Sequence, residues 1–162
     1  MHRVGQFVAH VRARVTPDEE AAVRAILGER AWPLFAAMPV ADRRHALDVV
    51  ARLRADGWED PDLLTAALLH DAAKGHRMRL WHRIGGVLLG AISPSLLARV
   101  ASEDSRSWRH PFHLYLHHDR LSADLAEAAG CSPRSVAFLR GTAAGFGDVH
   151  EAHALKVADD AS

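Results

Sequence analysis

The feature of this chain that most restricts its fold is a repeated signal for the start of a helix. A residue that can cap a helix with its side-chain oxygen is followed at once by proline, which is favoured at the first helical position. This happens at Thr16-Pro17, Asp60-Pro61, Ser93-Pro94 and Ser132-Pro133. No segment of useful length alternates apolar and polar residues as a half-buried strand does. The sequence therefore predicts an all-α fold, a helical bundle.

Glycine and proline separate the predicted helices from one another. Glu19 completes a capping box with Thr16, Gly28 is expected to end the first helix, and Asp148 is expected to cap the last one. Four apolar residues of that last helix are expected to face the core: Ala154, Leu155, Val157 and Ala158. The predicted helices cover residues 17–27, 32–38, 42–55, 61–75, 80–91 and 111–129, with further helices starting at 94, 133 and 149.

Composition limits the class of protein. The length of 162 residues suits one domain with its own core. The formal charge is zero, with 20 basic and 20 acidic side chains, so no overall field attracts nucleic acid, and none is expected as a partner. The longest nearly apolar stretch, residues 84–92, is far below the roughly 20 residues that span a bilayer, so no membrane association is expected. The lone Cys131 and the lack of a signal-peptide pattern indicate a cytoplasmic protein.

The dipeptide His70-Asp71 is the most informative chemical feature. It follows the run LLTAALL, which is apolar almost all round and is typical of a central helix. A histidine and a carboxylate at a helix end can simply be solvated. Here the apolar run places a nitrogen ligand and an oxygen ligand at the edge of the core, where an unpaired charge is costly. A divalent cation would remove that cost.

Further ligands must come from distant segments, because two ligands rarely hold a divalent ion. His45 lies upstream in RRHALDVV, and Asp159 lies on the last predicted helix in LKVADD. Asp160 is an alternative to Asp159, because either carboxylate could point inward so near the end of a helix. The sequence thus offers His45, His70, Asp71 and either Asp159 or Asp160 as candidate ligands.

The order of these residues resembles the HD superfamily of metal-dependent phosphohydrolases, whose pattern is His, then His-Asp, then Asp. The matching strings are RRHALDVV, LLHDAAKG and LKVADD. The resemblance covers residues 41–162, which we expect to form an HD core preceded by a helical extension over residues 1–40. It implies a divalent metal ion held by His45, His70, Asp71 and Asp159 inside a bundle of helices. Mixed nitrogen and oxygen ligands are compatible with Mn, Fe, Co, Ni, Zn or Mg.

Lys74 lies one helical turn after Asp71 and so on roughly the same face. A lysine near the C-terminal end of a helix can also be there only because its charge interacts favourably with the helix dipole. Similar lysines in HD enzymes of the His-Asp-x-x-Lys form contact substrate phosphate, and we assign catalysis to Asp71 and Lys74. Arg77, together with Arg79 and Arg83, forms a local basic patch that could bind phosphate or could be a solvated helix face.

A second metal ion, or the substrate, could be bound by histidines in RHPFHLYLHHDRLSADL. HD proteins with two metals use a histidine in this region, and His118 matches that place best. His117 is the near alternative and shares a helix face with His113. Both could also be surface histidines of an amphipathic helix. The second histidine pair of a two-metal site would fall around residues 140–143, which read Arg-Gly-Thr-Ala, so a complete two-metal site is in doubt.

The resemblance implies a metal-dependent phosphohydrolase that acts on a nucleotide or another small phosphate ester. The chain shows none of the GxxxxGK, HExxH, serine-elbow or paired-cysteine motifs of other chemistries. One alternative is a catalytically inactive module of the same fold that binds a metal or nucleotide for sensing. Another is a helical adaptor in which the four ligands are a coincidence.

Overall fold

The computed structural model describes residues 14–74 and 94–162, and every regular element in them is helical. This confirms the predicted all-α class. The elements are α2 (Pro17–Ala36), α3 (Val40–Ala55), α4 (Pro61–Leu69), α6 (Pro94–Val100), α7 (His110–Ala128), α8 (Pro133–Leu139), the 3-10 helix η1 (Ala143–Phe146) and α9 (Val149–Ala161). The helix predicted over residues 80–91 and the basic residue Arg77 lie outside the described residues.

Local capping explains where several of these helices start. Thr16 and Glu19 form the predicted capping box at α2, and Asp60 accepts hydrogen bonds from the first backbone amides of α4. The helix is interrupted at Gly28, as predicted, by a kink. Gly28 has a φ of 67°, a left-handed conformation that glycine adopts without steric cost, and the helix resumes beyond it as far as Ala36.

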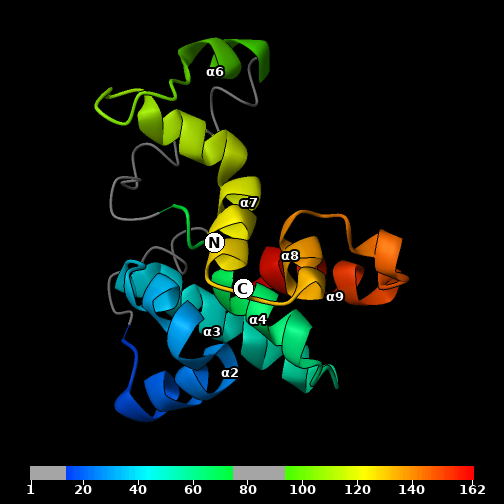
Figure 1. The fold of residues 1–162 in the computed structure, drawn as a ribbon. Coiled ribbons are helices and arrows are strands. Elements are labelled where there is room, and N and C mark those ends of the chain that lie inside the picture. The colour runs from blue at the N-terminus through cyan, green and yellow to red at the C-terminus, as the bar shows by residue number, and fades with distance from the viewer. Residues whose placement is uncertain (1–13, 75–93) are drawn as a thin grey trace, which may run out of the picture.

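Helix α4 lies at the centre of the bundle. Every residue from Leu63 to Leu69 is buried, as the apolar run predicted. The helix packs against α2, α3, α8 and α9, and α9 also packs against α3. Figure 1 shows α4 between the pair α2 and α3 and the pair α8 and α9. The residues that follow α4, starting with His70, therefore lie where α3, α4 and α9 pack together.

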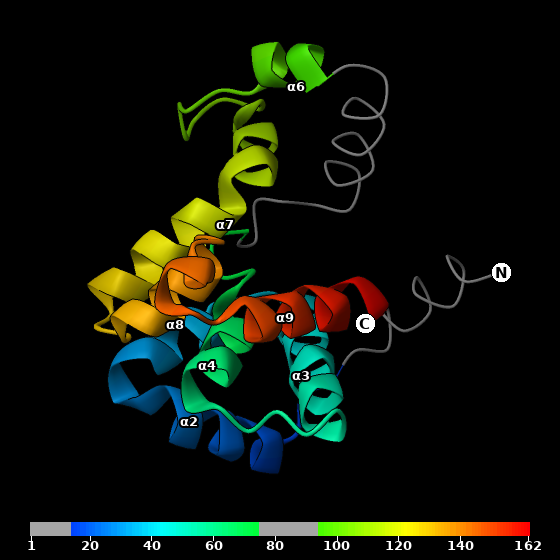
Figure 2. The same cartoon turned by 90° about the vertical axis from the view of Figure 1, so that its right-hand side faces the viewer.

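Helix α7 has two parts with different surroundings. Its C-terminal part packs against α8, whereas its N-terminal part stands away from the bundle beside α6 (Figures 1 and 2). No helix in the described part of the chain is long and apolar enough to cross a membrane.

Helix α9 departs from two predictions. Asp148 precedes it, but the Asp148 side chain makes no capping hydrogen bond and binds the guanidinium of Arg134 instead. Ala158 is buried as predicted, and Ala154 and Leu155 pack partly against the core. Val157 is 42% exposed, so its predicted place in the core is wrong. The packing of α9 on α3 and α4 sets its inward face at Ala154, Leu155 and Ala158, and Val157 is rotated off that face.

Candidate metal centre

Three helices place the four predicted ligands. His45 is in α3, His70 and Asp71 follow the last residue of α4, and Asp159 lies near the end of α9. The chain separates His45 from Asp159 by 114 positions, so their meeting is a product of the tertiary fold. The mutual packing of α3, α4 and α9 brings His45, His70 and Asp159 together, whereas Asp71 lies beside His70 but outside this group of three.

One carboxylate oxygen joins the two histidines. Asp159 Oδ1 lies 2.8 Å from His45 Nε2 and 3.3 Å from His70 Nε2. The candidate ligand atoms of His45, His70 and Asp159 all lie within 4.8 Å of one another. The rings of His45 and His70 are 5.3 Å apart and nearly perpendicular. Such a group of converging nitrogen and oxygen atoms is compact enough to share one cation.

Asp71 is buried beside this group. Its Oδ1 lies 3.6 Å from His70 Nε2 and 2.5 Å from the ammonium of Lys74, and its side chain is only 2% exposed. The turn that carries both residues is tied to α7, because the buried Ser122 hydroxyl accepts a hydrogen bond from the Ala73 amide. No feature of the sequence pointed to Ser122 as a support of the site.

Two buried atoms of the site lack a hydrogen bond of correct geometry. They are His70 Nε2 and Asp71 Oδ1, whose neighbours stand at ion-pair distance but are poorly aligned. A buried polar atom left without such a bond usually costs about 1 to 3 kcal/mol. His70 Nδ1 lies 2.8 Å from the Ala67 carbonyl oxygen, to which it can donate, and that bond would leave Nε2 free as a metal ligand. The donor set therefore fits a divalent metal ion.

The charges of the site support one another. Burial lowers the pKa of His70, but the nearby carboxylates of Asp159 and Asp71 outweigh it and raise that pKa overall. The hydrogen bond from His45 and the nearby ring of His70 hold the pKa of Asp159 far below its usual value. Burial raises the pKa of Asp71, yet His70 and Lys74 keep it below the ordinary range. Both carboxylates are thus charged at neutral pH and suited to a cation.

Of the two histidines considered for a second ion or the substrate, the structure brings His118 to the site. His118 Nε2 lies 4.0 Å from Asp71 Oδ1 and 3.1 Å from Asp119 Oδ1. Its Nδ1 faces the Tyr115 carbonyl oxygen at 3.0 Å. Burial and the charge of Lys74 lower the pKa of His118, which favours the neutral ring.

His117 is exposed and contacts another histidine ring at a tilt. Its ring lies 4.6 Å from that of His113 on the surface of α7. Adjacent residues of a helix point about 100° apart, so only one of His117 and His118 can face Asp71. The rotation of α7 decides in favour of His118.

The structure also distinguishes the two candidate aspartates of α9 by their partners. Asp159 contacts His45 and His70, whereas Asp160 Oδ2 accepts a hydrogen bond from Lys156 at 3.0 Å on the surface. The place of the missing second histidine pair is occupied by Arg140, which binds Asp124 and Glu127.

In comparisons with family models, curated proteins and solved structures, no match to this chain was found.

Proposed function

We propose that this chain is an HD-type, metal-dependent phosphohydrolase that acts on a nucleotide or another small phosphate ester. The observation that carries the proposal is the convergence of His45, His70 and Asp159 over the buried Asp71, with two site atoms left without a hydrogen bond. A purely structural cluster of buried polar groups would normally satisfy these atoms. A cation held by His45, His70, Asp71 and Asp159 would satisfy them.

The chain's own residues have distinct parts in such a reaction. The chemistry that a divalent cation supplies at this kind of site is the activation of water as a nucleophile and the polarisation of a phosphoryl oxygen. Asp71 and Asp159 provide the negative charge that holds the cation, and His45 and His70 orient it through Nε2. The Ala67 carbonyl keeps the His70 ring in the required direction.

Lys74 and His118 both lie beside Asp71 Oδ1. The ammonium of Lys74 cannot ligate a cation, but it can hold a phosphoryl oxygen as a compact positive charge. His118 Nε2 lies 4.0 Å from Asp71 Oδ1, and a largely neutral ring can accept or donate a proton near the reacting group. These two residues make a phosphate ester a better fit than an uncharged substrate.

The decisive experiment is a hydrolysis screen of nucleoside mono-, di- and triphosphates, cyclic nucleotides and simple phosphomonoesters with Mn, Fe, Co, Ni, Zn and Mg. Asp71→Asn should abolish metal-dependent phosphate release. Asp48→Asn is the matched control, because Asp48 is an exposed partner of Arg44 on α3 and lies outside the site. Equal activity in Asp71→Asn and the parent protein would exclude this site. Metal binding without turnover of any substrate would favour the sensing module.

A further inference from the structure

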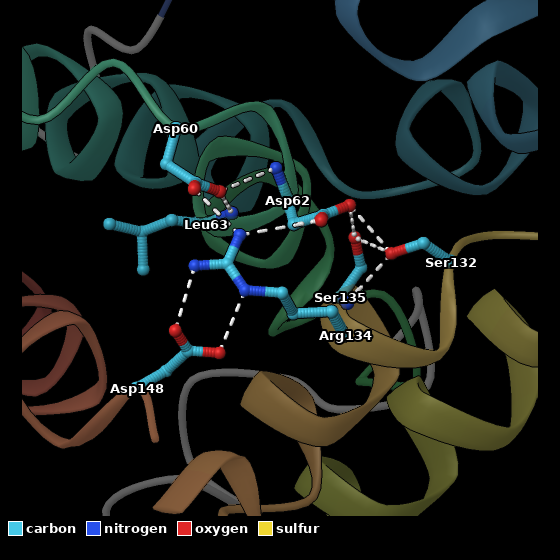
Figure 3. A network of polar contacts seen from close by, with 7 residues as sticks. All are labelled: Asp60, Asp62, Leu63, Ser132, Arg134, Ser135 and Asp148. Atoms are coloured by element: carbon cyan, nitrogen blue, oxygen red, sulfur yellow. Dashed lines mark hydrogen bonds and ion pairs between the residues drawn. The ribbon is translucent and has the colours of Figure 1, made fainter. Parts of the chain in front are cut away.

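A second polar centre lies at the opposite ends of two helices that form the metal site. Figure 3 shows Arg134, the second residue of α8, between carboxylates of three aspartates. Its Nε and Nη2 bind both oxygens of Asp148, at 2.7 and 2.9 Å. Its Nη1 lies 2.6 Å from Asp60 Oδ2 and 3.4 Å from Asp62 Oδ2. One guanidinium therefore joins the start of α4 to the start of α9.

Two of the three aspartates accept further hydrogen bonds. Asp60 Oδ1 accepts hydrogen bonds from the amides of Asp62 and Leu63 and so caps α4. Asp62 Oδ1 accepts hydrogen bonds from the hydroxyls of Ser132 and Ser135, at 2.6 and 2.9 Å. We call this group the Arg134 network; its members are Arg134, Asp60, Asp62, Asp148, Ser132 and Ser135.

The direction of the two helices links this network to the metal site. Helix α4 starts at Pro61 beside the network and ends at Leu69, just before His70 and Asp71. Helix α9 starts at Val149, next to Asp148, and carries Asp159 near its other end. The nine residues of α4 rise about 14 Å, at about 1.5 Å per residue. The two helices pack against each other, so both run from the network to the metal ligands.

We propose that Arg134 is a positioning residue for the metal site, an inference that rests on the proposed function. By tying the N-terminal ends of α4 and α9, it sets the position of Asp159 relative to His70 and Asp71 at their C-terminal ends. The bidentate contact with Asp148 sets direction as well as distance, because the guanidinium is planar.

Electrostatics make the guanidinium necessary for this arrangement. Asp60, Asp62 and Asp148 place three carboxylates around Arg134. Without the guanidinium these like charges would repel one another and favour separation of the two helix starts. A cation beside the N-terminal ends of helices is itself unfavourable to their dipoles, so Arg134 is held there by the carboxylates.

The chain offers a matched control in Arg140. This arginine also binds two carboxylates, Asp124 at 2.8 Å and Glu127 at 2.6 Å. Both partners are on α7, and all three side chains are at least one-third exposed. Arg140 therefore joins α8 to α7 without contacting α4 or α9, and its removal tests for a general effect of losing an arginine bridge.

The test compares Arg134→Met, Arg134→Lys, Asp148→Asn and Arg140→Met with the parent protein at a temperature where circular dichroism shows each to be fully folded. Zn²⁺ and Mn²⁺ are titrated calorimetrically into metal-free protein. Arg134→Met should weaken metal binding by about 10- to 100-fold, the range seen when residues that orient ligands are lost. The metal affinities of Arg134→Lys and Asp148→Asn should lie between those of Arg134→Met and the parent protein. The affinity of Arg140→Met should stay within about twofold of the parent.

Amide hydrogen exchange of the metal-free proteins gives a second readout. Arg134→Met should speed exchange in α9 and in the first turn of α4, whereas Arg140→Met should not. Unchanged metal affinity in folded Arg134→Met would overturn the inference even if the variant melts earlier. If Arg134→Met does not fold, the same comparison is made with Arg134→Lys and Asp148→Asn. If the parent protein binds neither metal, the proposed function fails, and unchanged exchange in α9 would overturn the role of Arg134 separately.

Discussion

The two ends of the α4–α9 pair use similar residues to different effect. At the N-terminal end, three aspartates surround Arg134, and the guanidinium, two serine hydroxyls and backbone amides supply donors to them. At the C-terminal end, Asp71 and Asp159 meet two histidines and Lys74, and His70 Nε2 and Asp71 Oδ1 remain without a hydrogen bond. At the N-terminal end, the guanidinium of Arg134 supplies the positive charge that the carboxylates need. At the C-terminal end, the ligand atoms lie close enough together to share a metal ion.

This difference separates a structural cluster from a candidate functional one. Buried polar groups in a finished structure are normally paired, so unpaired atoms among converging ligands indicate a function. The Arg134 network shows that this chain can satisfy a cluster of partly buried carboxylates with its own residues. The incomplete pairing at the other end is therefore informative, and the predictions below test the contrast from its largest expected effect to its smallest.

Metal removal should affect the C-terminal end most. A saturating metal that binds only the folded state should raise the free energy of unfolding by about 3 to 4 kcal/mol. Thermal melts with added metal and with a chelator measure this difference, and elemental analysis should find close to one metal ion per chain. The double variant His70→Ala, Asp71→Ala should lose both the metal and the difference. The double variant His150→Ala, Glu151→Ala is the control, because these residues lie at the start of α9, at the other end from Asp159, and it should keep both. Equal metal in all three proteins would refute the site.

Under the proposed function, Lys74→Met should depress turnover by about a hundredfold, because it removes the positive charge proposed to hold a phosphoryl oxygen. The metal content should stay near that of the parent protein, since an ammonium does not ligate a cation. The metal-free variant should be less stable than the metal-free parent, because Lys74 Nζ lies 2.5 Å from the buried Asp71 Oδ1. Steady-state kinetics, elemental analysis and thermal melts on one preparation separate these effects. Full activity would reduce Lys74 to a partner of Asp71, and loss of metal would make it a structural support of the site.

Asp60→Ala should be the most damaging single aspartate change at the N-terminal end of the pair. It removes the cap of α4 together with a contact to Arg134, and a lost cap typically costs about 1 kcal/mol and up to about 2. Asp60→Asn should cost less, because asparagine also caps helices well. Urea unfolding of the metal-free proteins measures both values. Equal losses in the two variants would show that the charge, and not the cap, is what matters at Asp60.

The helix starts were predictable because capping is a local interaction. Thr16, Asp60 and Ser132 each bind amides within three residues, so the sequence alone was enough to place them. Asp148 failed as a predicted cap because a residue 14 positions away, Arg134, binds its carboxylate. Val157 failed because the packing of α9 on α3 and α4 decides which of its apolar residues face inward.

For the candidate site, too, the local sequence predicted some features, whereas others depend on the tertiary packing. The apolar run before His70 indicated correctly that the His70-Asp71 pair lies at the edge of the core. The choice between His117 and His118 depends on the rotation of α7, and adjacent residues on one helix carry no local signal for it. Ser122 and Arg134 could not be found from the sequence, because their importance comes from contacts with segments 49 and 74 positions away.

The pH dependence of metal stabilisation should be on the order of 1 kcal/mol per pH unit for each proton displaced. The pKa of His70 is raised in the metal-free fold, so protonated His70 stabilises that form below its unfolded pKa of about 6.5. This contribution is lost as the pH rises through the raised pKa. A bound metal needs the neutral ring, so the difference in melting temperature between metal-loaded and metal-free protein should be larger at pH 8 than at pH 6. A difference that shrinks from pH 6 to pH 8 would contradict His70 as a ligand.

The smallest expected effect distinguishes the neighbouring aspartates of α9. Asp160 pairs with Lys156 one turn earlier, and both side chains are more than 60% exposed, so the pair should contribute at most about 0.5 kcal/mol. Asp160→Asn should therefore leave the metal content and the melting temperature almost unchanged. Asp159→Asn keeps the size of the side chain but removes the charge that faces His45 and His70, so it should lose the metal. Elemental analysis and thermal melts of the two variants side by side measure the contrast. If Asp160→Asn lost the metal while Asp159→Asn kept it, α9 would have to be rotated by about 100° in the metal-bound protein, and the contacts of Asp159 would belong to the metal-free form alone.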